Sequence, residues 1–75
     1  MTRLRFERLR KGWSLQTLGF HSGIQGAEIS KIERGILVPY RSQAERLAQA
    51  IGLLPEELLC EVGEYADAQA PARVQ

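Results

Sequence analysis

Apolar residues recur along this chain at spacings of three and four, the period of an α-helix with one buried face. Ile29 and Ile32 show the pattern most clearly, and Leu47 with Ile51 repeats it later in the chain. The only run rich in β-forming residues, 36–38, is too short to predict a paired strand. The pattern therefore predicts an all-α fold.

Capping residues and glycines mark where the first three helices should begin and end. Thr2 and Ser14 are residue types that cap helix N-termini. Gly23 follows the second apolar segment where a tight turn needs positive φ, which a residue without Cβ adopts freely. We therefore expect helices over residues 3–11, about 15–22 and about 25–34.

Two further helices are predicted in the second half of the chain. Ser42 and Glu45 have the spacing of a capping box, so a fourth helix should open there and end at Gly52. Pro55 suits the first position of a fifth helix. The apolar side of that helix would consist of Leu58, Leu59 and Val62.

The chain is expected to form one domain, residues 1–65, followed by a tail, residues 66–75. A length of 75 residues allows one domain at most and only a thin core. The tail is rich in Ala and Gln and has no periodic apolar face, which is typical of a frayed or disordered segment. Five short helices with brief links predict an orthogonal bundle.

Composition argues against several classes of protein. The single Cys60 cannot form an internal disulfide, and we expect it to be a half-buried small hydrophobe. No signal peptide is visible, and no apolar run approaches the ~20 residues that span a membrane, so a cytoplasmic protein is expected. His21 has no clustered metal-ligating partners, and no catalytic set is visible, so we expect no metal, cofactor or enzymatic activity.

Charge is unevenly distributed although the formal net charge is only +1. Residues 1–12 contain five basic side chains against one acidic side chain, whereas residues 55–67 contain five acidic side chains and no basic one. This polarity can orient the molecule on a polyanion, while near-neutrality limits the affinity.

The segment from Ser14 to Gly35 has the layout of a helix-turn-helix. Two short helices are joined by a glycine turn, which sets them at a steep angle and lets the second enter a major groove. A small residue is needed in the first helix where the second packs against it, and Gly19 stands there. Trp13, just before this segment, is expected to belong to the core.

A wider set of residues follows a known pattern: Leu4, Arg8, Gly12, Trp13, Ser14, Leu18, Gly23, Ile24, Ile29, Ser30, Ile32, Glu33, Arg34, Gly35, Pro39, Leu47, Ala48, Leu53, Glu57 and Leu58. Through them, residues 4–59 resemble the Cro/C1 (Xre-type) helix-turn-helix family of phage repressors and small bacterial regulators. The resemblance implies a five-helix, lambda-repressor-like domain that binds palindromic operators as a dimer, without a cofactor. It also implies a structural ion pair between Arg8 and Glu33.

The exposed side of the third helix holds the candidates for contact with DNA bases. Leu15 departs from the family, which typically has glutamine there. The base-contact candidates are Gln25, Ala27, Glu28 and Lys31, although the same face can equally be a solvated helix surface. The candidate phosphate contacts are Ser14, Ser30, Arg34, Tyr40, Arg41 and Ser42.

The loop after the third helix departs from the resemblance, because relatives often carry basic residues where this chain has an apolar run at 36–38. In one interpretation Leu37 and Pro39 fold back over the thin core. In the other, the loop is part of a surface that contacts a second copy or another protein. Candidates for that contact are Ile36, Val38, Tyr40, Leu54, Leu59 and Val62.

Two functional hypotheses follow. The first is a sequence-specific transcriptional regulator that binds double-stranded DNA as a homodimer, with RNA polymerase or another regulator as a possible further partner. The second is a helix-turn-helix adaptor that binds a protein instead of DNA. The near-neutral net charge, Gly26 and Ala27 on the reading face of the third helix, and the apolar loop at 36–38 motivate the second hypothesis.

Overall fold

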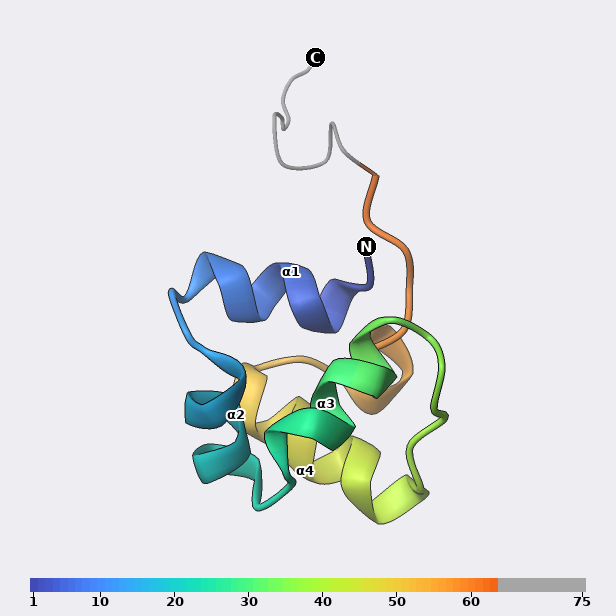
Figure 1. The fold of residues 1–75 in the computed structure, drawn as a ribbon. Helices are drawn as coiled ribbons and strands as arrows, with labels where there is room; N and C mark the ends of the chain where they lie inside the picture. Colours follow the sequence, from blue (N-terminus) through green and yellow to red (C-terminus); the bar gives the residue numbers. More distant parts are fainter. Residues whose placement is uncertain (64–75) are drawn as a thin grey trace.

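A computed structural model describes residues 1–63, which fold into four α-helices and a short 3₁₀ turn (Figure 1). The expected tail over 66–75 and the last two residues of the expected domain lie outside the described residues. Residues 1–63 contain no strand, and a single antiparallel bridge joins Thr2 to Glu61. The all-α prediction is confirmed. The elements are α1 (Arg3–Arg10), α2 (Leu15–Ser22), α3 (Gly26–Glu33), α4 (Arg41–Ile51) and η1 (Pro55–Glu57).

The core lies between the helices and is built from the side chains that the helical spacing predicted to face inward. Ile29 and Ile32 of α3 are fully buried, and α2 packs against both α3 and α4. Leu37 and Trp13 are partly buried against this core, so the loop after α3 does fold back at Leu37. The buried apolar residues are Leu4, Leu18, Ile24, Ile29, Ile32, Leu47, Ala48, Ile51 and Leu58.

The first two helices begin at the predicted caps. The Thr2 hydroxyl accepts from the backbone N–H of Arg5 at 3.4 Å, and the Ser14 hydroxyl accepts from the N–H of Thr17 at 3.0 Å. Each bond satisfies an N–H of the first turn that has no partner within the helix. Gly23 ends α2 in the left-handed region at φ +75°, as the turn requires.

The prediction that Ser42 caps α4 is wrong, because the helix begins earlier. Tyr40 is the N-cap, and its carbonyl already accepts from the N–H of Ala44 at 2.8 Å. The side chain of Gln43 reaches back and accepts from the N–H of Tyr40 at 2.9 Å. Glutamine at the third helical position thus supplies the return bond that a capping box uses.

The prediction of a fifth α-helix is also wrong: only a 3₁₀ turn forms after Pro55. Its continuation is prevented by bonds to the start of α1, whose first N–H groups have no partner within their own helix. The N–H of Leu4 donates to the carbonyl of Leu58 at 2.9 Å, and that of Arg3 donates to Cys60 at 2.7 Å. The N–H of Val62, which a helix would direct to Leu58, donates to Met1.

The extended course after η1 also overturns the expected burial of Cys60. This thiol is exposed, and its sulfur donates to the carbonyl of Glu56 at 3.6 Å. Leu58 takes the inward position of this segment, while Leu59 is exposed. The segment after η1 therefore packs on the core through the side chain of Leu58 and not through the apolar face of a helix.

The predicted ion pair between Arg8 and Glu33 is present and buried, and it joins α1 to the end of α3. The guanidinium donates from Nε to Oε2 at 2.6 Å and from Nη2 to Oε1 at 3.1 Å. Its Nη1 also donates to the carbonyl of Trp13 at 2.8 Å. The Thr2 hydroxyl donates to the Glu33 carbonyl at 3.0 Å, so the last turn of α3 is held from two sides.

Glu7 is a second buried carboxylate on α1, and the sequence patterns did not identify it. Burial by itself raises the pKa of this carboxyl, but hydrogen bonds from Arg10 and Arg3, with their charges, outweigh burial and lower the pKa. The distances from Glu7 are 2.8 Å to Arg10 and 3.1 Å to Arg3. Two of the basic side chains of α1, Arg3 and Arg10, are therefore paired with a carboxylate of the same helix.

We expect Arg8→Ala to lower the free energy of unfolding by about 3 kcal/mol, because Glu33 would stay buried without its partner. Arg41→Ala is the control, since Arg41 is 93% exposed in its ion pair with Glu45. The control should change stability by less than about 1 kcal/mol. Urea unfolding followed by circular dichroism measures both, and equal losses in the two variants would contradict a structural role for the buried pair.

Candidate nucleic-acid interface

The turn between α2 and α3 depends on a close approach of backbone at Gly19. A Cβ built on this residue would lie 2.6 Å from the carbonyl oxygen of Ile24, well inside any normal contact. Gly23, four residues later, has the positive φ that reverses the chain. These two glycines set α3 against α2, which confirms the need for a small residue at position 19.

The face of α3 opposite the core is open to solvent. Ile29 and Ile32 are buried behind the helix, while Ala27 and Lys31 on its outer side are exposed. Gln25 is the N-cap residue, is also exposed, and makes no capping hydrogen bond with its side chain. In Figure 1, α3 lies in front of α4, and no other described segment covers it.

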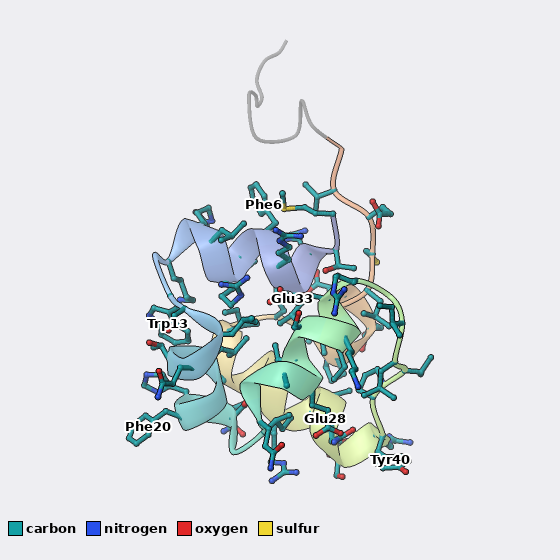
Figure 2. All side chains as sticks on the ribbon, in the orientation of Figure 1. Phe6, Trp13, Phe20, Glu28, Glu33 and Tyr40 are labelled. Atoms are coloured by element: carbon teal, nitrogen blue, oxygen red, sulfur yellow. The ribbon has the colours of Figure 1, made fainter. Side chains whose placement is uncertain are left out.

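Glu28 differs from the other base-contact candidates because a neighbouring helix holds it. The side-chain amide of Gln43 on α4 donates to Oε2 of Glu28 at 3.0 Å, and both side chains are half-buried. Figure 2 shows Glu28 directed toward α4, on the side of the molecule where Tyr40 begins that helix. The sequence did not suggest Gln43, because this contact depends on how α3 and α4 meet.

The structure brings three of the phosphate candidates together and separates the others. Tyr40, Arg41 and Ser42 are all at the N-terminal end of α4, where the helix dipole favours an anion. Arg34 lies at the C-terminal end of α3, and its Nε donates to the Ser30 carbonyl at 3.3 Å. Ser30 is half-buried, and Ser14 lies at the start of α2 with its hydroxyl in the cap.

The candidates for a partner contact are mostly exposed. Ile36 is 64% exposed and Val38 is 76% exposed, although Leu37 and Pro39 between and beside them are half-buried. Leu37 and Pro39 therefore fold back toward the core, as the first interpretation of the loop predicted, while Ile36 and Val38 stay available for a partner, as the second one did. We call Ile36, Val38 and Tyr40 the apolar loop surface. The other candidates, exposed Leu54 and Leu59 and half-buried Val62, come from the C-terminal part of the described chain.

Other kinds of site find no support in the part of the chain that the structure describes. Within residues 1–63, no three His, Cys, Asp or Glu side chains are grouped so that they could hold a metal ion. None of the described helices combines the length and the apolar character needed to cross a membrane.

Comparison with known families agrees with this geometry. The chain belongs to the helix-turn-helix domain family, whose match covers residues 2–59. This range contains the turn at Gly23, all four α-helices and the buried Arg8–Glu33 pair. No curated protein and no solved structure matches the chain.

Gly19→Ala should destabilise the domain by about 1–3 kcal/mol, although alanine is the better helix former, because the backbone of Ile24 would have to move. Gly26→Ala is the matched control, since its Cβ would meet Leu15 at an ordinary 3.5 Å. The control should be neutral or stabilising by up to about 1 kcal/mol. Thermal unfolding of both variants gives the comparison, and a stabilising Gly19→Ala would contradict the close approach.

Proposed function

We propose that the protein is a transcriptional regulator that binds specific sequences of double-stranded DNA in the cytoplasm, with α3 in the major groove. The observation that carries this proposal is the open face of α3: Ile29 and Ile32 anchor the helix from behind, while Ala27 and Lys31 face solvent. A helix held in this way by a preceding helix and a tight turn has the geometry that helix-turn-helix proteins insert into a groove. Membership of the helix-turn-helix domain family supports the same proposal.

The side chains of this face suit the edges of bases in different ways. Gln25 can pair with adenine through its amide, and Lys31 can donate to guanine or to a phosphate. The methyl group of Ala27 can contact a thymine methyl, and Glu28 can accept from cytosine. The negative charge of the Glu28 carboxylate would lie beside the phosphates. The hydrogen bond that the Gln43 amide donates to this carboxylate partly offsets that charge.

The proposed contacts to phosphate are few, which favours a dimer. Arg34 and Arg41 are the cations among them, with Ser14, Ser30, Tyr40 and Ser42 as neutral donors. Since each cation adds nearly one unit to the salt dependence of binding, one copy should hold DNA only modestly. Two copies that meet through the apolar loop surface would present two α3 helices to half-sites about one helical turn apart.

Lys31→Ala tests the placement of α3. It should weaken binding to a pool of random duplexes about fivefold at low salt and lower the salt slope by about one unit. Lys11→Ala is the control, because it removes the same charge from the end of α1 and should stay within about twofold of the parent. Fluorescence anisotropy over a salt series measures both effects. Equal losses in the two variants, or an affinity that salt does not change, would contradict the proposal.

A helix-turn-helix adaptor is the second candidate, and one observation favours it. Exposed Ile36, Val38 and Tyr40 form an apolar surface where a DNA-binding loop would be expected to carry positive charge. In this alternative the surface binds a protein such as RNA polymerase or another regulator, and α3 is a solvated helix.

Ile36→Asp and Val38→Asp separate the two candidates, with Leu9→Asp on α1 as an exposed apolar control. If the apolar loop surface is the dimer contact, both loop variants should become monomeric in analytical ultracentrifugation and lose DNA affinity by tenfold or more, while the control does neither. If the protein is an adaptor, the loop variants should lose a partner in a pull-down and keep the parent's retention on DNA. Unchanged mass and unchanged binding in both assays would contradict any role for this surface.

A further inference from the structure

The solvent-facing side of α1 carries an apolar pair that the proposed function does not use. The buried side of this helix consists of Leu4, Glu7 and Arg8. Phe6 and Leu9 lie three residues apart and therefore share the other side of the helix. Phe6 is half-buried and Leu9 is 47% exposed. Apolar side chains that gather on an exposed face with a polar rim are typical of a protein contact.

The apolar pair borders a hollow of about 350 Å³. Its wall consists of Met1, Phe6, Leu9 and Arg10, so three of its members are apolar and the fourth is a cation. An apolar side chain of a partner can enter such a hollow, and the guanidinium of Arg10 can bind a carboxylate beside it.

Arginines lie on both flanks of the apolar pair. The period of 3.6 residues per turn places Arg5 on one flank and Arg3 and Arg10 on the other. Ion pairs of 3.1 Å and 2.8 Å join Arg3 and Arg10 to Glu7, whose side chain is only 7% exposed. Because one buried carboxylate is shared by two cations, the face as a whole presents positive charge to solvent.

The buried carboxylate also holds Arg10 ready for a second anion. Arg10 donates to Oε1 of Glu7 from Nε and from Nη2. Within residues 1–63 its Nη1 makes no hydrogen bond, and the side chain remains 67% exposed. A guanidinium that is already oriented loses less freedom when it binds a partner's carboxylate.

We propose that this face of α1 binds an acidic amphipathic segment of another protein. An apolar side chain of that segment fills the hollow, and carboxylates on its two flanks meet Arg10 and Arg5. An amphipathic helix that lays its apolar face into a groove offers this arrangement, because residues three and four apart share one face.

Charge and position favour this occupant over a second copy or DNA. A second α1 would bring its own arginines against the same face, and like charges oppose such a contact. DNA would match the charge but would leave Phe6 and Leu9 against phosphate groups. Figure 2 shows Phe6 on the opposite side of the molecule from Glu28 and Tyr40, which belong to the proposed DNA contacts. The acidic segment and a duplex can therefore be bound at the same time.

The experiment is a selection from a library of random peptides displayed on phage, with the full chain as target and the Leu9→Asp variant as counter-target. The counter-target removes acidic peptides that merely bind the basic side chains of the proposed DNA contacts, since it keeps all of those side chains. We expect the remaining peptides to share apolar residues at a spacing of three or four, flanked by Asp or Glu. Peptides rich in Lys and Arg, or a pool that does not prefer the parent, would overturn the proposal.

A recovered peptide then tests the two kinds of contact by fluorescence anisotropy. Leu9→Ala should weaken its binding about fivefold or more, while Val38→Ala, at an exposed apolar position of the loop, should stay within about twofold of the parent. Arg10→Gln should weaken binding about fivefold as well. Replacing the peptide's carboxylates one at a time by amides should find one whose loss is not additive with Arg10→Gln. Strict additivity at every carboxylate would contradict the role of Arg10.

Three outcomes would assign the face to a different occupant and reject the proposal. A lower mass of Leu9→Asp in analytical ultracentrifugation would indicate a second copy. Tighter peptide binding after Glu64→Gln with Asp67→Asn would indicate the chain's own acidic residues. Full competition by duplex DNA would indicate that the face belongs to the DNA surface. Because the peptide is bound without DNA, failure of the proposed function would leave this measurement unaffected.

Discussion

The carbonyl oxygen of Ile24 occupies the space that a side chain at position 19 would need, and the arrangement of α2 and α3 depends on this contact. A glycine inside a helix costs about 1 kcal/mol relative to alanine. That cost is accepted at Gly19 because only the missing Cβ lets the turn close at Gly23. Once the turn is closed, the buried side of α3 is fixed and its opposite side must face solvent.

The two ends of α3 are then fastened by polar contacts with other helices. At its first turn, Gln43 of α4 donates to Glu28. At its last turn, Arg8 of α1 binds Glu33 with two hydrogen bonds and reaches the Trp13 carbonyl as well. These contacts leave the exposed side of α3 free while restricting its orientation, and a rigid presenting element is what a precise recognition surface requires.

Much of this arrangement can be predicted from the sequence, because it is encoded locally. The caps at Thr2 and Ser14 and the inward pair Ile29 and Ile32 follow from spacing and side-chain chemistry. The Arg8–Glu33 pair lies 25 residues apart and was predicted only through the family resemblance. Local periodicity contains no information about such a distant contact.

One error is local, since α4 begins at Tyr40 and not at Ser42, but most of the others concern contacts between distant segments. Proline at 55 and two glutamates predict a helix, yet the carbonyls of Leu58 and Cys60 are used by the start of α1, so the helix stops after one turn. Glu28 is held by Gln43 of a neighbouring helix, a contact that depends on how α3 and α4 pack. Glu7 is also buried by packing, although its partners Arg3 and Arg10 lie on its own helix. The alternation of inward Leu37 with outward Ile36 and Val38 likewise combines two interpretations that the sequence presents as exclusive.

The central claim is that the open face of α3 reads the sequence of a DNA duplex. Selection of bound duplexes from a random library tests it most directly, because the library offers the protein every short sequence at once. The account predicts recovery of a palindrome whose half-sites lie about one helical turn apart. A recovered pool with no shared sequence, from a protein shown by its circular dichroism to be folded, would contradict it.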